Sequence, residues 1–518
     1  MNKTRKVRIK SCFVAIIFIA IAIAWPASGQ VRTGGLPNLG DGEDMSVAAE
    51  RRLGQRIARE IYREPDYLDD PVLGDYLQTI WQPLLASARA RGELSPELDE
   101  RFAFTPFLVR DRSVNAFALP GGYLGVHLGL ITLVSSRDEL ASVLGHELSH
   151  VTQRHIARMA SKQAQQTPWV IGAMILGMLA ASKSPDAANA AFAGSQALAQ
   201  QSQLNFSRDM EREADRIGFS VMTGAGFDGQ GFASMFDKLQ HANRINDNGS
   251  FPYLRSHPLT TERIADAQLR LPVDRAAQPA PLQMEPLLMS ARAKVLADPG
   301  VDALRAWVAE AGPPTASGST PVLDALPPAR RAAVVYAAIL AKLRLKDASG
   351  LAPLLARLAA LTAPDADASR SASLLAAEVA LAQDDPQRAL LVLPPGGSRA
   401  AVLLAAQAQS RLGSPEMLEQ AASALQTRVA VQPADALAWQ MLANVYGRQG
   451  HQARAIRADA ESRLAQLDYA AATDRLKAAQ ALLRSNGSRS PADNIEASII
   501  DTRARQVELL LREQALER

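Results

Sequence analysis

The motif H-E-x-x-H, which runs from His146 to His150, constrains the fold of this chain more than any other feature of its 518 residues. It lies inside a segment, residues 139–159, that is predicted to be a helix because a capping-box pattern, S-x-x-E, begins at Ser136. In a helix the two histidines are one turn apart, so both imidazoles project from one face and can ligate the same metal ion. Glu147 lies about 100° round that helix. Its carboxylate is therefore expected beside the open coordination position, where it can take a proton from a water molecule.

A metal site of this kind needs a third protein ligand, and the best candidate is Glu211. It lies in the sequence RDMEREAD (208–215), one turn from Asp215 on a second predicted helix. The aspartate could accept the remaining N–H of a ligand histidine and so fix the orientation of that ring. Glu213 points to another side of the helix and is interpreted as a surface residue. A solvated helix face also explains a glutamate in so charged a segment, so the residues alone leave both interpretations of Glu211 open.

These motifs resemble those of a known family of metalloproteases. HELSHVTQRH (146–155) followed by EREAD (211–215) is similar to the gluzincins of the M48 family, which share H-E-x-x-H with a distal E-x-x-A-D. The upstream NAFALPGG (115–122) and the downstream SHPLTTERI (256–264) also fit that family. The resemblance covers roughly residues 45–270 and implies a zincin-like peptidase fold.

The resemblance also implies roles for individual residues. It makes His146, His150 and Glu211 the ligands of one Zn²⁺ per chain. Glu147 is then the general base, and Asp215 supports a ligand histidine from behind.

His257 and His155 require separate interpretation. His257 precedes Pro258, which disfavours helix and suggests a loop, and in the resembling family this segment returns to the active-site cleft. We therefore expect His257 to reach the zinc environment, where it stabilises the oxyanion or occupies the open metal position and holds the enzyme idle; the alternative is an ordinary loop histidine. His155 is nine residues beyond His146 on the same predicted helix, too far along to ligate the same ion, and is interpreted as structural.

Strand-like alternation precedes the motif helix. Residues 102–109 and 114–126 alternate, and a Pro-Gly-Gly turn at 120–122 interrupts the second stretch. An edge strand beside the metal could pair with the backbone of an extended substrate, whereas an interior strand could not. The residues expected on this substrate strand are Asn115, Ala116, Phe117, Ala118 and Leu119.

The N-terminus has the pattern of a secretory signal peptide. Five basic residues precede a 14-residue apolar run, Cys12–Trp25, and cleavage is expected before Gln30; the run is short for a membrane span of about 20 residues. Cleavage removes five of the 56 basic residues and none of the 53 acidic ones, which changes the formal charge from +3 to −2. Nucleic-acid binding thereby loses its only support. The single cysteine leaves with the same segment, which suits the oxidising periplasm.

The C-terminal half is rich in Ala and Leu and has the pattern of a helical repeat. Residues 436–456 carry large and small side chains at the spacing of a tetratricopeptide helix pair, and residues 374–393 and 403–425 are degenerate copies. A non-repetitive helical bundle is the alternative. The predicted fold class is mainly α: an α+β peptidase domain with a small sheet, followed by an all-α domain. The predicted segments are a signal peptide (1–29), an extended leader (30–44), the M48-like domain (45–272), a linker (273–287) and a tetratricopeptide-like domain (288–518).

A second apolar run, residues 168–181, has no charged side chain and is too short to span a bilayer. Three interpretations remain open: a buried core helix, a lid over the cleft, or a hairpin that touches a membrane or a partner.

The predicted function is that of an exported zinc-dependent endopeptidase. With the signal peptide and the repeats added, the whole chain resembles periplasmic M48 proteases of the outer membrane. That resemblance implies unfolded or misassembled outer-membrane proteins as substrates and the barrel-assembly machinery as a partner of the repeats. The alternative is a periplasmic chaperone or assembly scaffold that keeps proteolysis in reserve.

Overall fold

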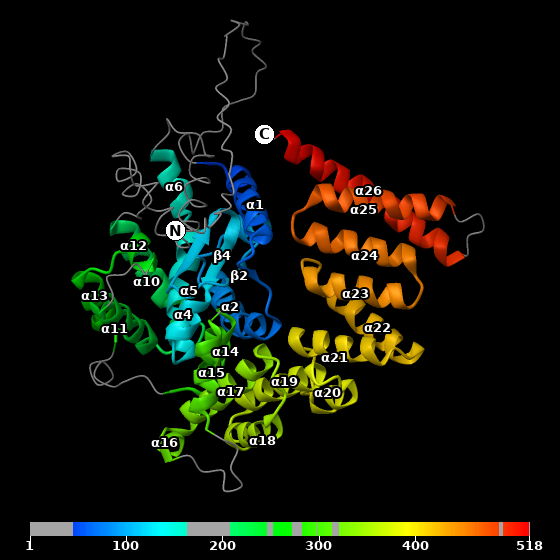
Figure 1. The fold of residues 1–518 in the computed structure, drawn as a ribbon. Coiled ribbons are helices and arrows are strands. Elements are labelled where there is room, and N and C mark those ends of the chain that lie inside the picture. Colours follow the sequence, from blue (N-terminus) through cyan, green and yellow to red (C-terminus); the bar gives the residue numbers. More distant parts are fainter. Residues whose placement is uncertain are drawn as a thin grey trace, which may run out of the picture. The chain divides into compact units, whose positions relative to one another are not determined.

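The computed structural model describes residues 45–162, 208–245, 252–271, 282–297, 299–312, 321–485 and 491–516. These residues confirm a mainly α protein with one small sheet (Figure 1). The signal peptide, the leader and the apolar run 168–181 lie outside the described residues, as does the linker up to residue 281.

The sheet is mixed and has four strands in the order β1-β2-β4-β3. The central pair, β2 and β4, is parallel, and the two outer pairings are antiparallel. The Pro-Gly-Gly turn predicted at 120–122 joins β3 to β4, with φ of 74° at Gly121 and 84° at Gly122, values that favour glycine. The strands are β1 (Tyr67–Leu68), β2 (Thr105–Val109), β3 (Ala116–Leu119) and β4 (Tyr123–His127).

Helices cover the sheet and continue to residue 269. α5 packs against β3, α2 against β2, and α1 against the Pro-Gly-Gly turn. Apolar residues that recur every three or four positions along α1 and α2 are buried. These helices are α1 (Val47–Arg63), α2 (Pro71–Ala90), α3 (Pro96–Arg101), α4 (Leu128–Leu133), α5 (Arg137–Thr152), α6 (His155–Lys162), α10 (Arg208–Gly224), α11 (Gln230–Ile245), α12 (Pro252–Ser256) and α13 (Thr261–Leu269).

The prediction of one continuous helix over residues 139–159 is wrong in one respect. α5 ends at Thr152, and α6 begins at His155 in a new direction. Arg154 breaks the helix because it adopts a φ of 51°, a left-handed conformation that costs a non-glycine residue about 1–2 kcal/mol. Its guanidinium is held by Glu50, with Nε 2.9 Å from Oε2, so a contact with α1 stabilises the break.

The remaining elements described are all helices, and from α17 to α26 each helix packs against the next one in the chain (Figure 1). The tetratricopeptide-like segment 436–456 forms α23 and the start of α24, joined by a turn in which Gly450 has a φ of 81°. α14 begins at Met284, so residues 284–287 are helical rather than linker. These helices are α14 (Met284–Leu296), α15 (Val301–Glu310), α16 (Pro321–Asp324), α17 (Pro328–Arg344), α18 (Leu351–Thr362), α19 (Ala366–Ala382), α20 (Pro386–Val392), α21 (Arg399–Leu412), α22 (Pro415–Val431), α23 (Ala436–Arg448), α24 (Gln452–Ala465), α25 (Tyr469–Ser485) and α26 (Pro491–Leu516). Among the helices that the structure describes, none is both long and apolar enough to span a bilayer.

A buried arginine joins the two halves of the chain. Arg292 on α14 donates to both carboxylate oxygens of Asp70, at 2.8 and 2.7 Å, and to both of Glu378 on α19, at 3.0 and 2.6 Å. Asp70 is also the N-cap of α2, where it accepts from Leu73 N. One guanidinium therefore orders the start of α2, α14 and α19.

Replacement of Arg292 by Met is expected to destabilise the protein by about 3–5 kcal/mol, because Asp70 and Glu378 lose their shared cation in a buried place. Chemical denaturation, followed by circular dichroism, measures the shift. Arg305→Met is the control, since that side chain is 71% exposed on α15; it is expected to change the free energy of unfolding by less than about 0.5 kcal/mol. Equal effects of the two substitutions would contradict the role given to Arg292.

Candidate metal centre

Side chains from three segments converge on one point. α5 supplies His146 and His150, α10 supplies Glu211, and His257 follows directly after α12. All four side chains are buried, and one donor atom of each lies within 4.8 Å of the others. The structure thus places the three predicted ligands beside His257, the residue that was expected to reach them.

The distances between the donor atoms suit a tetrahedral ion. His146 Nε2 lies 3.0 Å from His150 Nε2 and 3.5 Å from Glu211 Oε2. His257 Nδ1 lies 3.4 Å from His146 Nε2 and 3.0 Å from Glu211 Oε1. Ligands about 2.0–2.1 Å from a tetrahedral zinc are about 3.3–3.4 Å apart. Nitrogen and carboxylate donors at this spacing therefore fit a zinc ion.

Asp215 and Arg263 support the ligand His146. Asp215 Oδ1 lies 2.9 Å from His146 Nδ1, the ring nitrogen that faces away from the cluster, as predicted. Arg263 on α13 holds Asp215 through two hydrogen bonds of 2.6 and 2.8 Å, and its Nη1 lies 2.8 Å from Glu211 Oε2. Sequence reasoning missed Arg263, although it lies within the SHPLTTERI segment.

His150 has a different set of partners. Its Nδ1 lies 2.8 Å from Nδ1 of His155, which is itself fully buried. His155 Nε2 lies 3.0 Å from Glu213 Oε2, and Arg158 Nη1 donates to the same oxygen at 2.9 Å. Two interpretations from the sequence are corrected here. His155 is not on the motif helix, because the break at Arg154 turns it back toward His150, and Glu213 is not merely a surface residue.

The protonation of the cluster follows from burial and from neighbouring carboxylates. Burial lowers the pKa of His146, but Asp215 and Glu211 outweigh this effect and raise that pKa to about 9. Burial holds the pKa of His150 well below its ordinary value. The pKa of Glu211 is also well below its ordinary value, because the histidines outweigh burial. In the absence of metal a proton therefore resides on His146, and a metal must displace it.

Glu147 lies next to the metal-cluster residues, beside His257. Its Oε2 accepts a 2.9 Å hydrogen bond from Ala118 N on β3. Its Oε1 is buried, accepts no hydrogen bond from the residues described, and lies 3.4 Å from His257 Nε2. Burial raises the pKa of Glu147, which increases its affinity for a proton, as a general base and acid requires.

The predicted substrate strand contains β3. In the sheet that the structure describes, β3 pairs only with β4 and is an edge strand. Asn115 immediately precedes it and has a buried Oδ1 without a hydrogen-bond partner among the described residues. Of the five residues expected on this strand, Phe117 is half-buried and the other four are buried; the residues of β3 are Ala116, Phe117, Ala118 and Leu119.

Tyr253 on α12 is a further residue that the sequence did not reveal. It is buried, and its ring stacks on His257 with the centroids 4.8 Å apart and the planes 30° apart. Its backbone N–H donates to Val114 O at 3.4 Å, just before the edge strand. A short helix between α11 and His257 gave no chemical signal that could have singled out this tyrosine.

Two glycines allow α5 and α10 to approach closely. A Cβ on Gly218 would lie 2.9 Å from His146 N and 3.0 Å from Gly145 O, and one on Gly145 would lie 3.1 Å from Gly218 O. All of these are backbone atoms, which cannot move aside cheaply. The ligand from α10 therefore reaches the histidines of α5 only because both contact positions lack a side chain.

Gly218→Ala is expected to separate α5 from α10, to destabilise the protein by about 1–3 kcal/mol and to lower the metal content of the purified protein. Denaturation and metal analysis measure the two effects. Gly447→Ala on α23 is the control, because a Cβ there meets no heavy atom within 4 Å. Full metal content and unchanged stability in Gly218→Ala would refute the close-contact argument.

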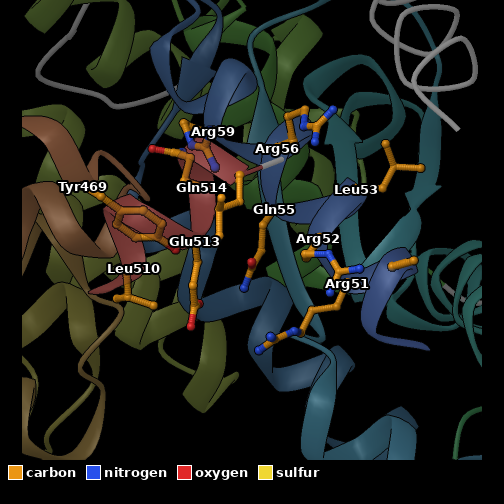
Figure 2. Close-up of a pocket in the computed structure, with 12 residues that line it drawn as sticks. Arg51, Arg52, Leu53, Gln55, Arg56, Arg59, Tyr469, Leu510, Glu513 and Gln514 are labelled. Atoms are coloured by element: carbon orange, nitrogen blue, oxygen red, sulfur yellow. The ribbon is translucent and has the colours of Figure 1, made fainter. Parts of the chain in front are cut away.

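A cavity beside α1 is a separate feature. It has a volume of about 620 Å³, lies between α1 and α26, and contains none of the metal-cluster residues (Figure 2). Arginines of α1 line one side, and residues of α25 and α26 line the other. The labelled residues are Arg51, Arg52, Leu53, Gln55, Arg56, Arg59, Tyr469, Leu510, Glu513 and Gln514.

Part of the chain matches a known protein family. Residues 77–271 match the family model described as Peptidase family M48, and this range contains the whole metal cluster. This part of the chain is similar to the M48 peptidases. The M48 metallopeptidases use a metal ion, in agreement with the donor set formed by the two histidines of α5, Glu211 and His257.

Curated relatives are similar to part of this chain. A relative from Vibrio cholerae is 36% identical over 283 residues, which is 54% of this chain and 55% of the relative. The beta-barrel assembly-enhancing protease of Escherichia coli K12 is 32% identical over 270 residues, 51% of this chain and 53% of that protein. The mitochondrial metalloendopeptidase OMA1 of Arabidopsis thaliana is 32% identical over 164 residues, 32% of this chain and 31% of that protein. The chain thus spans about half the length of the first two relatives.

Proposed function

We propose that this protein is an exported zinc-dependent endopeptidase that degrades misfolded or misassembled outer-membrane proteins. The observation that carries the proposal is the buried group of His146, His150, Glu211 and His257, with Glu147 beside it. The relatives named beta-barrel assembly-enhancing protease support the choice of substrate class. The signal-peptide pattern of residues 1–29 supports the periplasm as its location.

Different residues of the chain have different roles in the proposed peptidase reaction. His146, His150 and Glu211 would hold the metal, which when bound polarises the scissile carbonyl and acidifies a water molecule. Glu147 takes the proton of the attacking water on Oε1, the buried oxygen that faces His257. Glu147 then delivers that proton to the leaving amine, while Ala118 N keeps its other oxygen in place.

The substrate is expected to lie along β3. Where its N–H groups are not bound by Glu147, as that of Ala118 is, an extended peptide can add to the edge of this strand through main-chain hydrogen bonds. The buried Oδ1 of Asn115 is a ready acceptor for a substrate N–H at the start of the strand. Recognition of backbone rather than sequence suits an enzyme that acts on unfolded chains.

Replacement of Glu147 by Gln is expected to lower peptidase activity by at least about 100-fold, because the glutamine cannot take up the proton. Cleavage of casein or of an unfolded β-barrel protein measures the loss. Zinc content should stay near one per chain, since Glu147 is not a ligand. A wild-type chain without stoichiometric zinc would overturn the proposed function itself.

We further propose that His257 fills the fourth metal position and holds the enzyme idle. Its Nδ1 lies within 3.4 Å of two other donor atoms, and stacking on Tyr253 holds its ring. A fourth protein ligand occupies the place where the attacking water must bind. The substrate must therefore displace His257, which restrains proteolysis until an unfolded chain enters the cleft.

His257→Ala is accordingly expected to weaken zinc binding by about 10-fold or more and to raise the turnover of a short peptide that cannot displace the histidine. Peptide hydrolysis under saturating zinc and a zinc-binding titration measure the two effects. Reduced turnover with full zinc occupancy would instead indicate that His257 stabilises the oxyanion. Unchanged activity and affinity would remove His257 from the site.

The alternative function is that of a periplasmic chaperone or assembly scaffold with proteolysis in reserve. The specific observation in its favour is the long series of consecutively packed helices from α17 to α26, a form typical of partner-binding surfaces. In either case the repeats are proposed to recruit substrates or the barrel-assembly machinery. Complementation of a deletion strain by Glu147→Gln separates the two functions: full rescue favours the scaffold, and failure favours the protease.

A further inference from the structure

We infer that His155 and Glu213 are positioning residues that set the proton and the ring orientation of the metal ligand His150. The inference rests on the proposed metal site and deepens it. His150 directs Nε2 into the donor group and Nδ1 toward Nδ1 of His155, 2.8 Å away. The two imidazoles are almost perpendicular, with 75° between their planes. A ligand and a fully buried second histidine are thus joined nitrogen to nitrogen.

The proton positions along this contact follow from the chemistry of neutral imidazole. A histidine that gives the lone pair of Nε2 to a metal carries its proton on Nδ1. His150 Nδ1–H must therefore donate, and His155 Nδ1 must accept with a bare lone pair. His155 then has its own proton on Nε2 and donates it to Glu213 Oε2, 3.0 Å away. Each hydrogen bond in the series fixes the next one.

Glu213 is suited to the end of this series because its carboxylate forms an ion pair with Arg158. Arg158 Nη1 donates to the same oxygen at 2.9 Å. An ionised carboxylate accepts hydrogen bonds only, so it orients His155 with Nε2 as the donor. His146 obtains equivalent support directly from Asp215, without an intervening histidine.

The break between α5 and α6 makes the arrangement possible. On a continuous helix His155 would be five residues from His150, more than one turn away and on another face. The left-handed Arg154 separates α5 from α6, which starts at His155. The ring of His155 then lies against that of His150, with the centroids 4.8 Å apart. The left-handed conformation of Arg154 has a conformational cost, but it allows the imidazole of His155 to contact that of His150.

The test compares zinc affinity in full-length variants, by competition with a chromophoric chelator. His155→Ala and Glu213→Ala are each expected to weaken zinc binding by about 10- to 100-fold. His155→Gln is expected to recover most of the affinity, because the amide oxygen can accept from His150 and the amide nitrogen can donate to Glu213. The matched controls are His241→Gln, an exposed histidine on α11, and Asp209→Ala, whose side chain is 88% exposed on α10; both should bind zinc like the wild type.

Two further measurements separate positioning from a merely structural role. A positioning role reduces the zinc-induced rise in Tm and alters the absorption spectrum of the cobalt-substituted protein. A structural role lowers the Tm of the metal-free and zinc-loaded proteins equally and leaves affinity and spectrum unchanged; that result, or no rescue by His155→Gln, would overturn the inference. If the wild-type protein itself binds no zinc, the proposed function fails first. If His155→Ala does not fold, Glu213→Ala and His155→Gln still decide the question.

Discussion

The contact of α5 with α10 is the constraint on which the metal site depends. Gly145 directly precedes the first ligand histidine, and Gly218 lies two turns beyond Glu211 on its own helix. Where these glycines meet, the backbones are close enough that a single methyl group would not fit. Ligand sets tolerate displacements of only about 0.5 Å. A donor group drawn from two helices must therefore be set by backbone contact, because side-chain adjustment alone would be too loose.

The close contact of α5 with α10 buries carboxylates, and neighbouring cations and hydrogen-bond donors stabilise their charges to different extents. Glu211 and Asp215 share the guanidinium of Arg263 and face protonatable histidines, so their pKa values are lowered. Glu147 receives one backbone hydrogen bond, and its pKa is raised by burial. The difference separates the roles of chemically similar groups: well-compensated carboxylates remain anionic supports, whereas the poorly compensated one retains affinity for a proton.

Helix periodicity made part of this site predictable. The H-E-x-x-H spacing and the four-residue step from Glu211 to Asp215 each place side chains on one face, and the structure agrees with both placements. The contact between His155 and His150 was not predictable in this way. It depends on a left-handed Arg154, a residue type without the turn signal of Gly or Asn, and this conformation is held by Glu50, 104 positions away. The sequence shows local periodicity, but it does not show which long-range ion pair will break a helix.

The boundary between the two halves was also less distinct in the structure than in the sequence. Composition changes near residues 273–287, yet one apolar core continues from α2 through α14, α17 and α19 to α21. Helices from α21 onward also form further clusters of their own. α2 packs against both α5 and α10, and its N-cap Asp70 is bound by Arg292 of α14. The first helices after the boundary therefore belong energetically to the peptidase fold. Because a buried carboxylate without its cation is costly, α2 depends on Arg292, a residue that lies outside the segment matched by the M48 family model.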